Sequence, residues 1–322
     1  MKHLTIKEAT DLLVADEIVA IPTETVYGLA ADARSDVAVR KIFKAKGRPV
    51  DNPLIVHIGD VDQVDDLAQG VSEKARRLMA HFWPGPLTLI LPSSGVVSEL
   101  VTAGLDTVGI RMPGHDVALE LLRTSGIPLA APSANISGKP SPTTVTHVIH
   151  DLENRIAGVV DGGRCEVGLE STVIDMTTNV PIILRPGGIS CDEIESVIGR
   201  VDISNGMFDQ PKAPGMKYAH YSPNASVYLV KGDYRYFEKG VLDFRRENLK
   251  VGILCRDIAR ENYEVADIVK GIGEKGKNLY DALRDFDAQE VDVVLCECFD
   301  DVVVMNRLLK ASEERILSEV ED

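Results

Sequence analysis

The sequence is poor in aromatic residues and in cysteine, and it contains no long apolar run. Aromatics make up 5% of the 322 residues, and the five cysteines are an odd number at irregular spacings. The composition argues against a disulfide scaffold. No stretch of about 18 consecutive apolar residues occurs, so we expect no membrane span. The first residues combine acidic side chains with no apolar core, so we expect no signal peptide and a cytoplasmic protein.

Basic residues are also in the minority. Lys and Arg total 35 against 50 Asp and Glu, which gives a formal net charge of -15. A chain this acidic is a poor candidate for broad binding to nucleic acid or anionic membranes, so we expect neither as a partner. The motifs G-x-S-x-G, H-E-x-x-H and C-x-x-C are absent, as is the P-loop, which argues against the common hydrolases, zinc proteases, thiol redox proteins and P-loop nucleotidases.

The composition that remains, 44% hydrophobic and 26% charged, is that of a globular protein. Because the chain is longer than one core usually organises, we expect two domains. Mixed helical and strand-like patterns predict an α/β domain with a mixed sheet over residues 1–200. Residues 201–224 have little periodicity and three prolines, which predicts a linker. Residues 225–322 predict a small domain with a parallel sheet.

The expected elements follow from apolar periodicity and from capping residues, such as Thr5 for the first helix and Ser35 or Asp36 for the second. In the first domain we expect helices at about 5–15, 36–45, 72–82, 116–124, 143–150 and 191–199. The expected strands there are 18–21, 54–58, 87–91, 108–112, 129–131, 156–160, 172–175 and 182–184. In the second domain we expect strands at 226–230, 250–254, 265–269 and 292–296, and helices at 257–262, 278–286 and 303–318.

Two loops carry groups that suit an anion. Lys44, Lys46 and Arg48 lie at the end of a predicted helix, next to Gly and Pro. They either complement the helix dipole or bind an anion, and the residues alone do not separate these readings. The second loop, 131–143, follows an apolar strand and is rich in small hydroxylated residues that can donate to phosphate or ribose. A capped surface loop explains it equally well.

Three further features are more local. Arg111 and Arg185 each end an apolar strand and are followed by Pro and Gly, which is more suggestive of a site than a surface arginine. Thr23-Glu24-Thr25 is a polar break in apolar surroundings. His57 closes a strand, where a lone histidine is more often structural than catalytic.

The second domain contains a G-x-G-x-x-G pattern at 271–276, with Asp292 at the spacing of a ribose ligand. The loop is rich in charge, however, and nothing near it resembles a hydride-transfer site, so we do not favour a dinucleotide site. Cys296 and Cys298 lie in an expected buried strand with no further metal ligands nearby, and we favour no functional thiol.

Taken together, a set of motifs resembles the threonylcarbamoyl-AMP synthase family. They are Lys46-Gly-Arg48-Pro, Asn52-Pro-Leu-Ile-Val-His57, Trp83-Pro-Gly-Pro-Leu-Thr, Gly109-Ile-Arg111-Met-Pro, Ala131-Pro-Ser133-Ala-Asn135, Ser171-Thr-Val, Leu-Arg185-Pro-Gly and Pro214-Gly-Met-Lys-Tyr218-Ala-His220-Tyr221-Ser-Pro. The resemblance implies a twisted mixed-sheet YrdC-like catalytic domain over 1–200. It also implies a linker over the active site at 201–224 and a small Rossmann-like domain over 225–322.

The resemblance further implies a nucleotidyltransferase. L-threonine, bicarbonate and ATP, with Mg²⁺ on the triphosphate, would give threonylcarbamoyl-AMP and pyrophosphate. The product would pass to a threonylcarbamoyl-transferase complex for the t6A37 modification of tRNA. Two other classes remain open: an RNA-binding protein that uses a cationic concavity, and a nucleotide-sensing regulatory protein whose second domain is the receiver.

The family's pattern also implies roles for individual residues, with Lys46 and Arg48 as the catalytic pair. The implied ATP-binding residues are Lys46, Arg48, Asn52, Thr107, Ser133, Asn135, Ser141, Arg185 and Tyr221. The implied threonine-binding residues are Thr25, His57, Arg111, Ala131 and Ser171. The implied linker lid consists of Tyr218, His220 and Tyr221. A general base is not identified, and bicarbonate is expected near Lys46 and Ser133.

Overall fold

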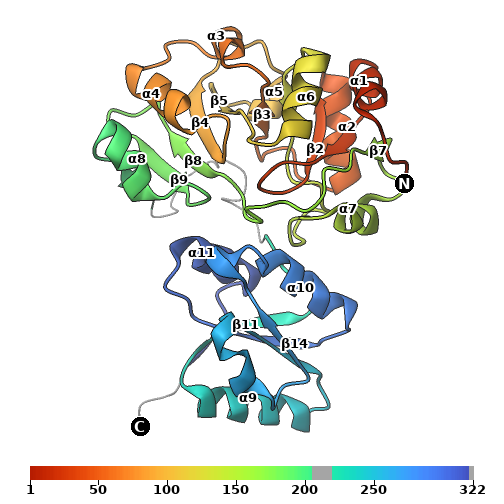
Figure 1. Ribbon diagram of the computed structural model, residues 1–322, viewed down its shortest axis with the longest axis vertical. Helices are drawn as coiled ribbons and strands as arrows, with labels where there is room; N and C mark the ends of the chain where they lie inside the picture. The colour runs from red at the N-terminus through yellow and green to blue at the C-terminus, as the bar shows by residue number, and fades with distance from the viewer. Residues whose placement is uncertain (205–219, 319–322) are drawn as a thin grey trace. The chain divides into compact units, whose positions relative to one another are not determined.

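The computed structural model describes residues 1–204 and 220–318. Contacts divide the chain into two compact units. The first consists of Met1–Ser137 and Ser141–Lys217, and the second of Gly138–Pro140 and Tyr218–Asp322 (Figure 1). The three residues Gly138–Pro140 therefore belong with the second unit, within which Ser222 donates its backbone N–H to the carbonyl of Gly138 at 2.9 Å.

The first unit is built on a mixed sheet of 10 strands in the order β10-β9-β8-β4-β5-β3-β6-β2-β1-β7. The pairs β1/β7, β3/β5, β4/β8 and β9/β10 are parallel, and the other neighbours are antiparallel. The predicted mixed α/β fold is thus confirmed. The strands are β1 Val19–Ile21, β2 Gly28–Asp32, β3 Ile55–His57, β4 Leu87–Pro92, β5 Thr107–Arg111, β6 Leu129–Ala130, β7 Gly158–Val159, β8 Thr172–Asp175, β9 Ile182–Arg185 and β10 Asp202–Ile203.

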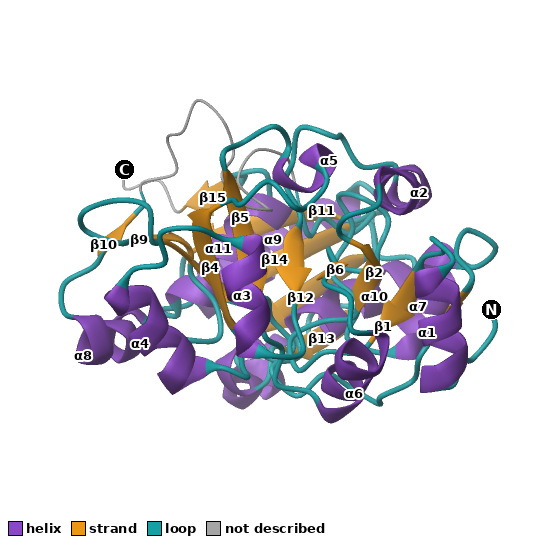
Figure 2. Cartoon of the chain, turned by 90° about the horizontal axis from the view of Figure 1, so that it is seen from above, coloured by secondary structure: helices purple, strands orange, loops and turns teal. Residues whose placement is uncertain are grey.

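Helices cover this sheet, with α1 packed on α6 and α4 packed on α8 (Figures 1 and 2). Thr5 forms a capping box with Glu8, and the Ser35 side chain caps α2, as their positions predicted. Gly47 ends α2 in the left-handed region, at φ 62. The helices are α1 Ile6–Val14, α2 Asp36–Lys46, the 3₁₀ helix η1 Val61–Gln63, α3 Val64–Leu67, α4 Glu73–Phe82, α5 Glu99–Thr102, α6 Asp116–Ser125, α7 Val145–Leu152 and α8 Cys191–Ile198.

The central strands are buried along almost their whole length. All five residues of β5 and the first five of β4 are buried, so side chains on both faces of the sheet leave water. This explains why these strands read in the sequence as continuous apolar runs rather than as alternating patterns. It also means that a charged residue at a strand end, such as Arg111, is itself buried.

The second unit has a five-stranded sheet in the order β13-β12-β14-β11-β15, in which every pair is parallel. The predicted small parallel-sheet domain is therefore confirmed. Its strands are β11 Ser226–Lys231, β12 Val251–Cys255, β13 Ile268–Gly271, β14 Val293–Glu297 and β15 Ile316–Ser318. Its helices are α9 Tyr234–Arg246, η2 Asp257–Tyr263, η3 Glu274–Gly276, α10 Leu279–Ala288 and α11 Val302–Ala311.

The structure differs from the expected elements in several places. Helix α9 and strand β2 were not predicted. The segment expected as a helix at 257–262 is the 3₁₀ helix η2. The helix expected at 303–318 ends at Ala311, because Glu313 and Glu314 adopt left-handed conformations with φ of 50 and 61, and the chain then enters β15. No helix in the described ranges is long and apolar enough to cross a membrane.

Candidate active site

Lys46 connects the segment at the end of α2 to the loop 131–143, the two segments that were predicted to suit an anion. It is the last residue of α2, and its side chain is only 1% exposed. Its Nζ donates to the backbone carbonyls of Ser133 and Asn135, the latter at 2.6 Å. Burial and the neighbouring Arg48 charge lower the pKa of Lys46, while Asp151 opposes this shift. Three of the predicted ATP-binding residues thus lie together.

The peptide bond between Asn135 and Ile136 is held at both of its polar atoms. Lys46 donates to its carbonyl oxygen, and its N–H donates to the Oδ2 of Asp151 at 3.3 Å. Asp151 lies in α7 and is 6% exposed. Asp151 was not predicted from the sequence, because an aspartate on an amphipathic helix is usually a solvated residue. Here it fixes the orientation of the loop and supplies a negative charge to Lys46.

Arg48 and Asn52 also lie together, as predicted. Arg48 donates to the carbonyl of Asn52 through Nε at 3.4 Å and Nη2 at 3.3 Å, and to that of Pro53 at 3.2 Å. Strands β3 and β5 are parallel, with Ile55 beside Gly109. Thr107 at the start of β5 therefore lies beside Pro53, which precedes β3. The Oδ1 of Asn52 is buried and has no hydrogen-bond partner among the described residues.

Arg111 lies at the opposite end of β5 from Thr107. Its guanidinium is 4% exposed and donates to Thr25 Oγ1 at 2.9 Å and to the carbonyl of Gly85 at 3.2 Å, and it lies 2.6 Å from Glu24 Oε2. The two hydrogen bonds use the Nε N–H and one N–H of Nη1, whereas Nη2 faces Glu24 as an ion pair and makes no hydrogen bond to a described residue. Both terminal nitrogens therefore keep N–H groups that are not hydrogen-bonded, and such a pair suits the two oxygens of a carboxylate.

Glu24 is a site residue that the sequence analysis missed. The signal was present, since the polar break Thr23-Glu24-Thr25 was selected, but only Thr25 was given a role. Burial raises the pKa of Glu24, but the Arg111 charge and the backbone N–H of Gly114 outweigh it and bring the pKa below its usual value. Glu24 is therefore an ionised partner that neutralises a buried arginine.

His57 ends β3 directly beside Arg111 in the parallel register. It is 3% exposed, and burial together with the Arg111 charge lowers its pKa to about 3. The imidazole is therefore neutral at physiological pH. Its Nδ1 lies 3.3 Å from the carbonyl of Ile55 and donates to it, since a carbonyl oxygen only accepts.

Arg185 and Ser171 connect the two groups of predicted residues. Arg185 ends β9 and donates to the carbonyl of Ser171 through Nε at 3.2 Å and Nη2 at 3.0 Å, and to its Oγ at 3.2 Å. Two partners that were not predicted complete this region: Thr88 lies 2.8 Å from the Ser171 hydroxyl, and Glu170 accepts from Ser141 at 2.7 Å.

The remaining predicted residues are placed less directly. Ala131 donates its backbone N–H to the carbonyl of Ile55 at 2.9 Å, which puts it next to the strand that carries His57. Tyr221 is in the second unit, where its ring stacks on Tyr280 with centroids 5.3 Å apart. His220 is its neighbour in the chain, and Tyr218 lies outside the described residues.

Comparison with known proteins assigns the chain to a family. A family model described as "Telomere recombination" matches residues 11–187, and one described as "Threonylcarbamoyl-AMP synthase, C-terminal domain" matches residues 189–313. A threonylcarbamoyl-AMP synthase of Bacillus subtilis is 49% identical, over 97% of this chain and 94% of that protein. One of Pyrococcus abyssi is 47% identical, over 97% of this chain and 95% of its own length. The chain belongs to the threonylcarbamoyl-AMP synthase family.

A solved structure of a family member agrees with the fold. The crystal structure of P. abyssi Sua5 complexed with L-threonine covers 98% of this chain and 96% of its own, with 46% identity and a TM-score of 0.93. The resemblance derived from the sequence motifs is thereby confirmed. The roles of individual residues remain predictions that the geometry above makes specific.

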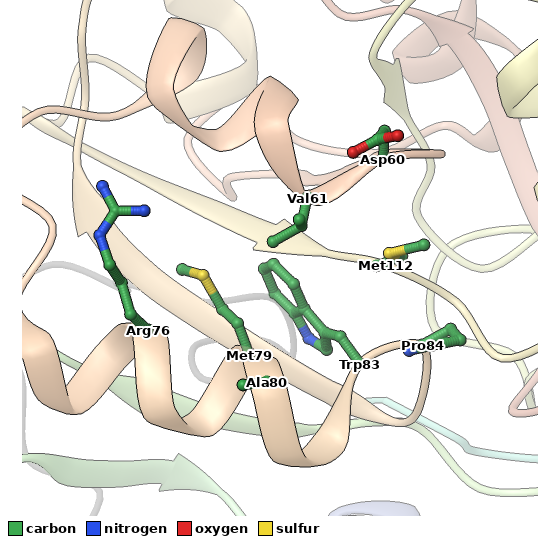
Figure 3. Close-up of a pocket in the computed structure, with 8 residues that line it drawn as sticks. All are labelled: Asp60, Val61, Arg76, Met79, Ala80, Trp83, Pro84 and Met112. Atoms are coloured by element: carbon green, nitrogen blue, oxygen red, sulfur yellow. The ribbon is translucent and has the colours of Figure 1, made fainter.

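The first unit also has an apolar cavity of about 330 Å³ (Figure 3). None of the predicted site residues lines it, although Met112 directly follows Arg111 in the sequence. Trp83 uses its indole N–H on the carbonyl of Leu87, so it presents only its ring. The charged residues of the cavity are engaged elsewhere, since Asp60 caps η1 and Arg76 pairs with Asp65 at 2.8 Å. The lining residues are Asp60, Val61, Arg76, Met79, Ala80, Trp83, Pro84 and Met112.

In the second unit, the G-x-G-x-x-G pattern lacks its ribose ligand. Gly271 ends β13, whereas the Asp292 Oδ2 accepts from the backbone of Lys250 at 2.8 Å, before β12 and β14 begin. Because all strands of the sheet are parallel, Gly271 and Asp292 lie at opposite ends of the strands. The dinucleotide site is therefore not supported. All five cysteines are free, and burial raises the pKa of Cys255 to about 12 and also raises that of Cys296.

Proposed function

We propose that the chain synthesises threonylcarbamoyl-AMP from L-threonine, bicarbonate and ATP, with release of pyrophosphate. Family membership supports this, as does the L-threonine complex of the P. abyssi relative. The single observation that carries the proposal is Arg111: a buried arginine whose two terminal nitrogens both keep N–H groups that are not hydrogen-bonded to described residues is a site for a substrate carboxylate.

In this proposal Arg111 binds the threonine carboxylate, and Thr25, His57, Ala131 and Ser171 surround the rest of the amino acid. The amine and bicarbonate form N-carboxy-threonine, with loss of water. A carboxylate oxygen of this compound then bonds to the α-phosphorus of ATP, and the bond from that phosphorus to the bridging oxygen breaks, so pyrophosphate leaves. Such a transfer depends on positioning and on charge neutralisation rather than on a protein nucleophile.

The nucleotide would lie along the loops that Lys46 organises. Lys46, Arg48 and Arg185 are cations buried to 8% exposure or less, where they offset phosphate charge more strongly than in water. Asn52, Thr107, Ser133, Asn135, Ser141 and Tyr221 complete the proposed set. Bicarbonate is proposed near Lys46 and Ser133.

Mg²⁺ would accompany the triphosphate. The described residues contain no group of three or more His, Cys, Asp or Glu placed to hold a metal. As the family resemblance implies, the ion would be held mainly by phosphate oxygens and water. When bound, it would neutralise phosphate charge. Lys46 and Arg48 would bind the phosphate oxygens that the metal does not contact.

No protein general base is assigned. His57, with a pKa of about 3, and Glu24, whose pKa is lowered, are both too weak to take a proton from an ammonium group at neutral pH. The amine proton therefore leaves to solvent or to bicarbonate in this proposal.

The product is a mixed anhydride that water hydrolyses. We propose that it passes to a threonylcarbamoyl-transferase complex in the cytoplasm for t6A formation in tRNA. The role of Tyr218, His220 and Tyr221 as a lid stays a prediction of the family resemblance. Alanine substitution of His220 and Tyr221 should shorten the lifetime of the intermediate, measured by chromatography of the quenched reaction. An unchanged lifetime would contradict this prediction.

The test of the activity is pyrophosphate release from ATP, with L-threonine and bicarbonate omitted in turn. Release should require both, and Arg111→Ala should lower kcat/KM for threonine by about 10²-fold or more, because one partner of a charged contact is removed. Arg34→Ala is the matched control, since Arg34 is 44% exposed in its side chain and pairs only with Asp32 among the described residues. Release that ignores threonine would show a different acceptor on the same nucleotide site.

A further inference from the structure

Two threonine hydroxyls form a short relay beside Arg111. Thr23 and Thr25 are each 1% exposed. The Thr23 Oγ1 lies 2.7 Å from the carbonyl oxygen of Val26 and 2.8 Å from the Thr25 Oγ1. The backbone N–H groups of Thr25 and Val26 also donate to the Thr23 hydroxyl, each at 3.2 Å.

The proton of each hydroxyl can be assigned by counting. A carbonyl oxygen only accepts, so the single proton of Thr23 goes to Val26. Thr23 therefore has no proton for Thr25, and the contact between the two hydroxyls must use the proton of Thr25. At 2.8 Å this contact takes one lone pair of the Thr23 hydroxyl, and the two backbone N–H groups at 3.2 Å share the other. The order of donation is Thr25 to Thr23 to the carbonyl of Val26.

This order leaves Thr25 as an acceptor. Its proton is engaged, and one of its two lone pairs accepts from Arg111 Nη1 at 2.9 Å. The other lone pair can only receive a hydrogen bond from a ligand. His57 has the same character, because its Nδ1 donates to Ile55 and its neutral ring leaves Nε2 as an acceptor.

We propose that Thr23 is a positioning residue that sets the specificity of the amino-acid site: it fixes Thr25 as a hydrogen-bond acceptor for the hydroxyl of the substrate. The inference rests on the proposed function and extends it to a residue to which the family's pattern gave no role. The site then offers donors to a carboxylate at Arg111 and an acceptor to a hydroxyl at Thr25.

Such an arrangement selects threonine against valine. The two amino acids differ by a hydroxyl in place of a methyl group, so shape alone separates them poorly. A fixed, buried acceptor gains a hydrogen bond from threonine and is left unpaired by valine. If Thr23 loses its hydroxyl, the proton of Thr25 is released, the group can rotate, and the fixed acceptor is lost.

The experiment compares wild type, Thr23→Val and Thr23→Ser by pyrophosphate release with L-threonine, L-valine and L-serine. Valine at position 23 keeps the shape and removes the hydroxyl, whereas serine keeps the hydroxyl. The threonine-to-valine ratio of kcat/KM should fall by about tenfold or more in Thr23→Val and remain within about threefold of wild type in Thr23→Ser. The threonine-to-serine ratio tests the methyl group, and it should change little in either variant.

Three results would overturn the inference. A threonine-to-valine ratio in Thr23→Val equal to that of wild type shows that Thr23 does not set specificity. An equal fall in both ratios shows a general loosening of the pocket. An equal loss for all three amino acids shows that Thr25 receives the ammonium group instead. Wild type that releases no pyrophosphate with threonine refutes the proposed function itself, which is a separate outcome.

A second variant covers the case in which Thr23→Val does not fold. Thr25→Val removes the acceptor directly but leaves the Thr23 contacts with Val26 and the backbone in place. It should show the same fall in the threonine-to-valine ratio. A preserved ratio in Thr25→Val would contradict the proposed role of the relay.

Discussion

Replacing Glu24 with glutamine should destabilise the ligand-free protein and make its stability depend on threonine. Glu24→Gln keeps the shape of the side chain and removes the charge that lies 2.6 Å from Arg111 Nη2, at a site where both side chains are less than 9% exposed. The arginine then stays buried with only neutral partners, Thr25 and the carbonyl of Gly85.

The size of the effect follows from this burial. Removing one partner of a buried ion pair costs about 3–5 kcal/mol. Glutamine still offers a carbonyl oxygen to Arg111, so we take the lower end, about 3 kcal/mol. For a unit of this size the melting temperature should fall by roughly 6–12 °C. Saturating L-threonine should recover more of this loss than it adds to wild type, because its carboxylate replaces the missing negative charge.

The assay is thermal unfolding with and without L-threonine. L-threoninol, which lacks the carboxylate, is the control ligand and should not rescue the variant. Glu17→Gln is the control variant: Glu17 pairs with Lys41 at 2.8 Å but is 44% exposed in its side chain, and such a surface pair contributes about 1 kcal/mol or less. A fall of under about 2 °C in Glu24→Gln, or equal rescue by threoninol, would refute the reasoning.

Three further predictions follow from described contacts. Asp151→Asn should raise KM for ATP about tenfold and leave KM for threonine near its wild-type value, since it removes a charge beside Lys46; steady-state pyrophosphate release measures both, and equal changes would contradict the role. Gly187→Ala should unfold or inactivate the first unit, because its Cβ would lie 2.3 Å from backbone atoms of Ser171 and Thr172; a melting temperature and activity near wild type would show that the backbone can yield. His57 has a pKa of about 3 when folded against 6.5 unfolded, so the unfolded chain binds the proton first and stability falls as the pH drops. Between pH 7 and 5 wild type should lose about 2 kcal/mol more than His57→Gln in urea unfolding; equal losses would show that the histidine is not held neutral.

The sequence predicted what depends on local signals. The caps at Thr5 and Ser35 and the strand-ending Arg111 and Arg185 were read correctly, because each depends on a few neighbouring residues. Helix α9 carried a comparable signal, with Asp233 as its cap, but its aromatic and charged residues and an internal glycine hid the period.

The partners across the fold could not be read in this way. Glu24 meets Arg111, and Asp151 meets the Asn135–Ile136 peptide, only after several strands have been ordered. An acidic residue near a threonine or on a helix has many ordinary explanations, and no pattern in one sequence names its partner. The family resemblance supplied the residues that are predicted to contact ligand but not the residues that orient them.

The length of β5 has a consequence for how this site can change. Thr107 and Arg111 are at its two ends, four residues apart, which is about 13 Å in a strand. They also share one face, because side chains alternate. Insertion or deletion of one residue between them would turn the side chain of one of the two to the other face of the sheet. If both side chains are to keep their face, β5 can be lengthened only by two residues at a time. A longer amino acid must therefore be accommodated by an exchange of side chains, because Arg111 cannot shift gradually along the strand.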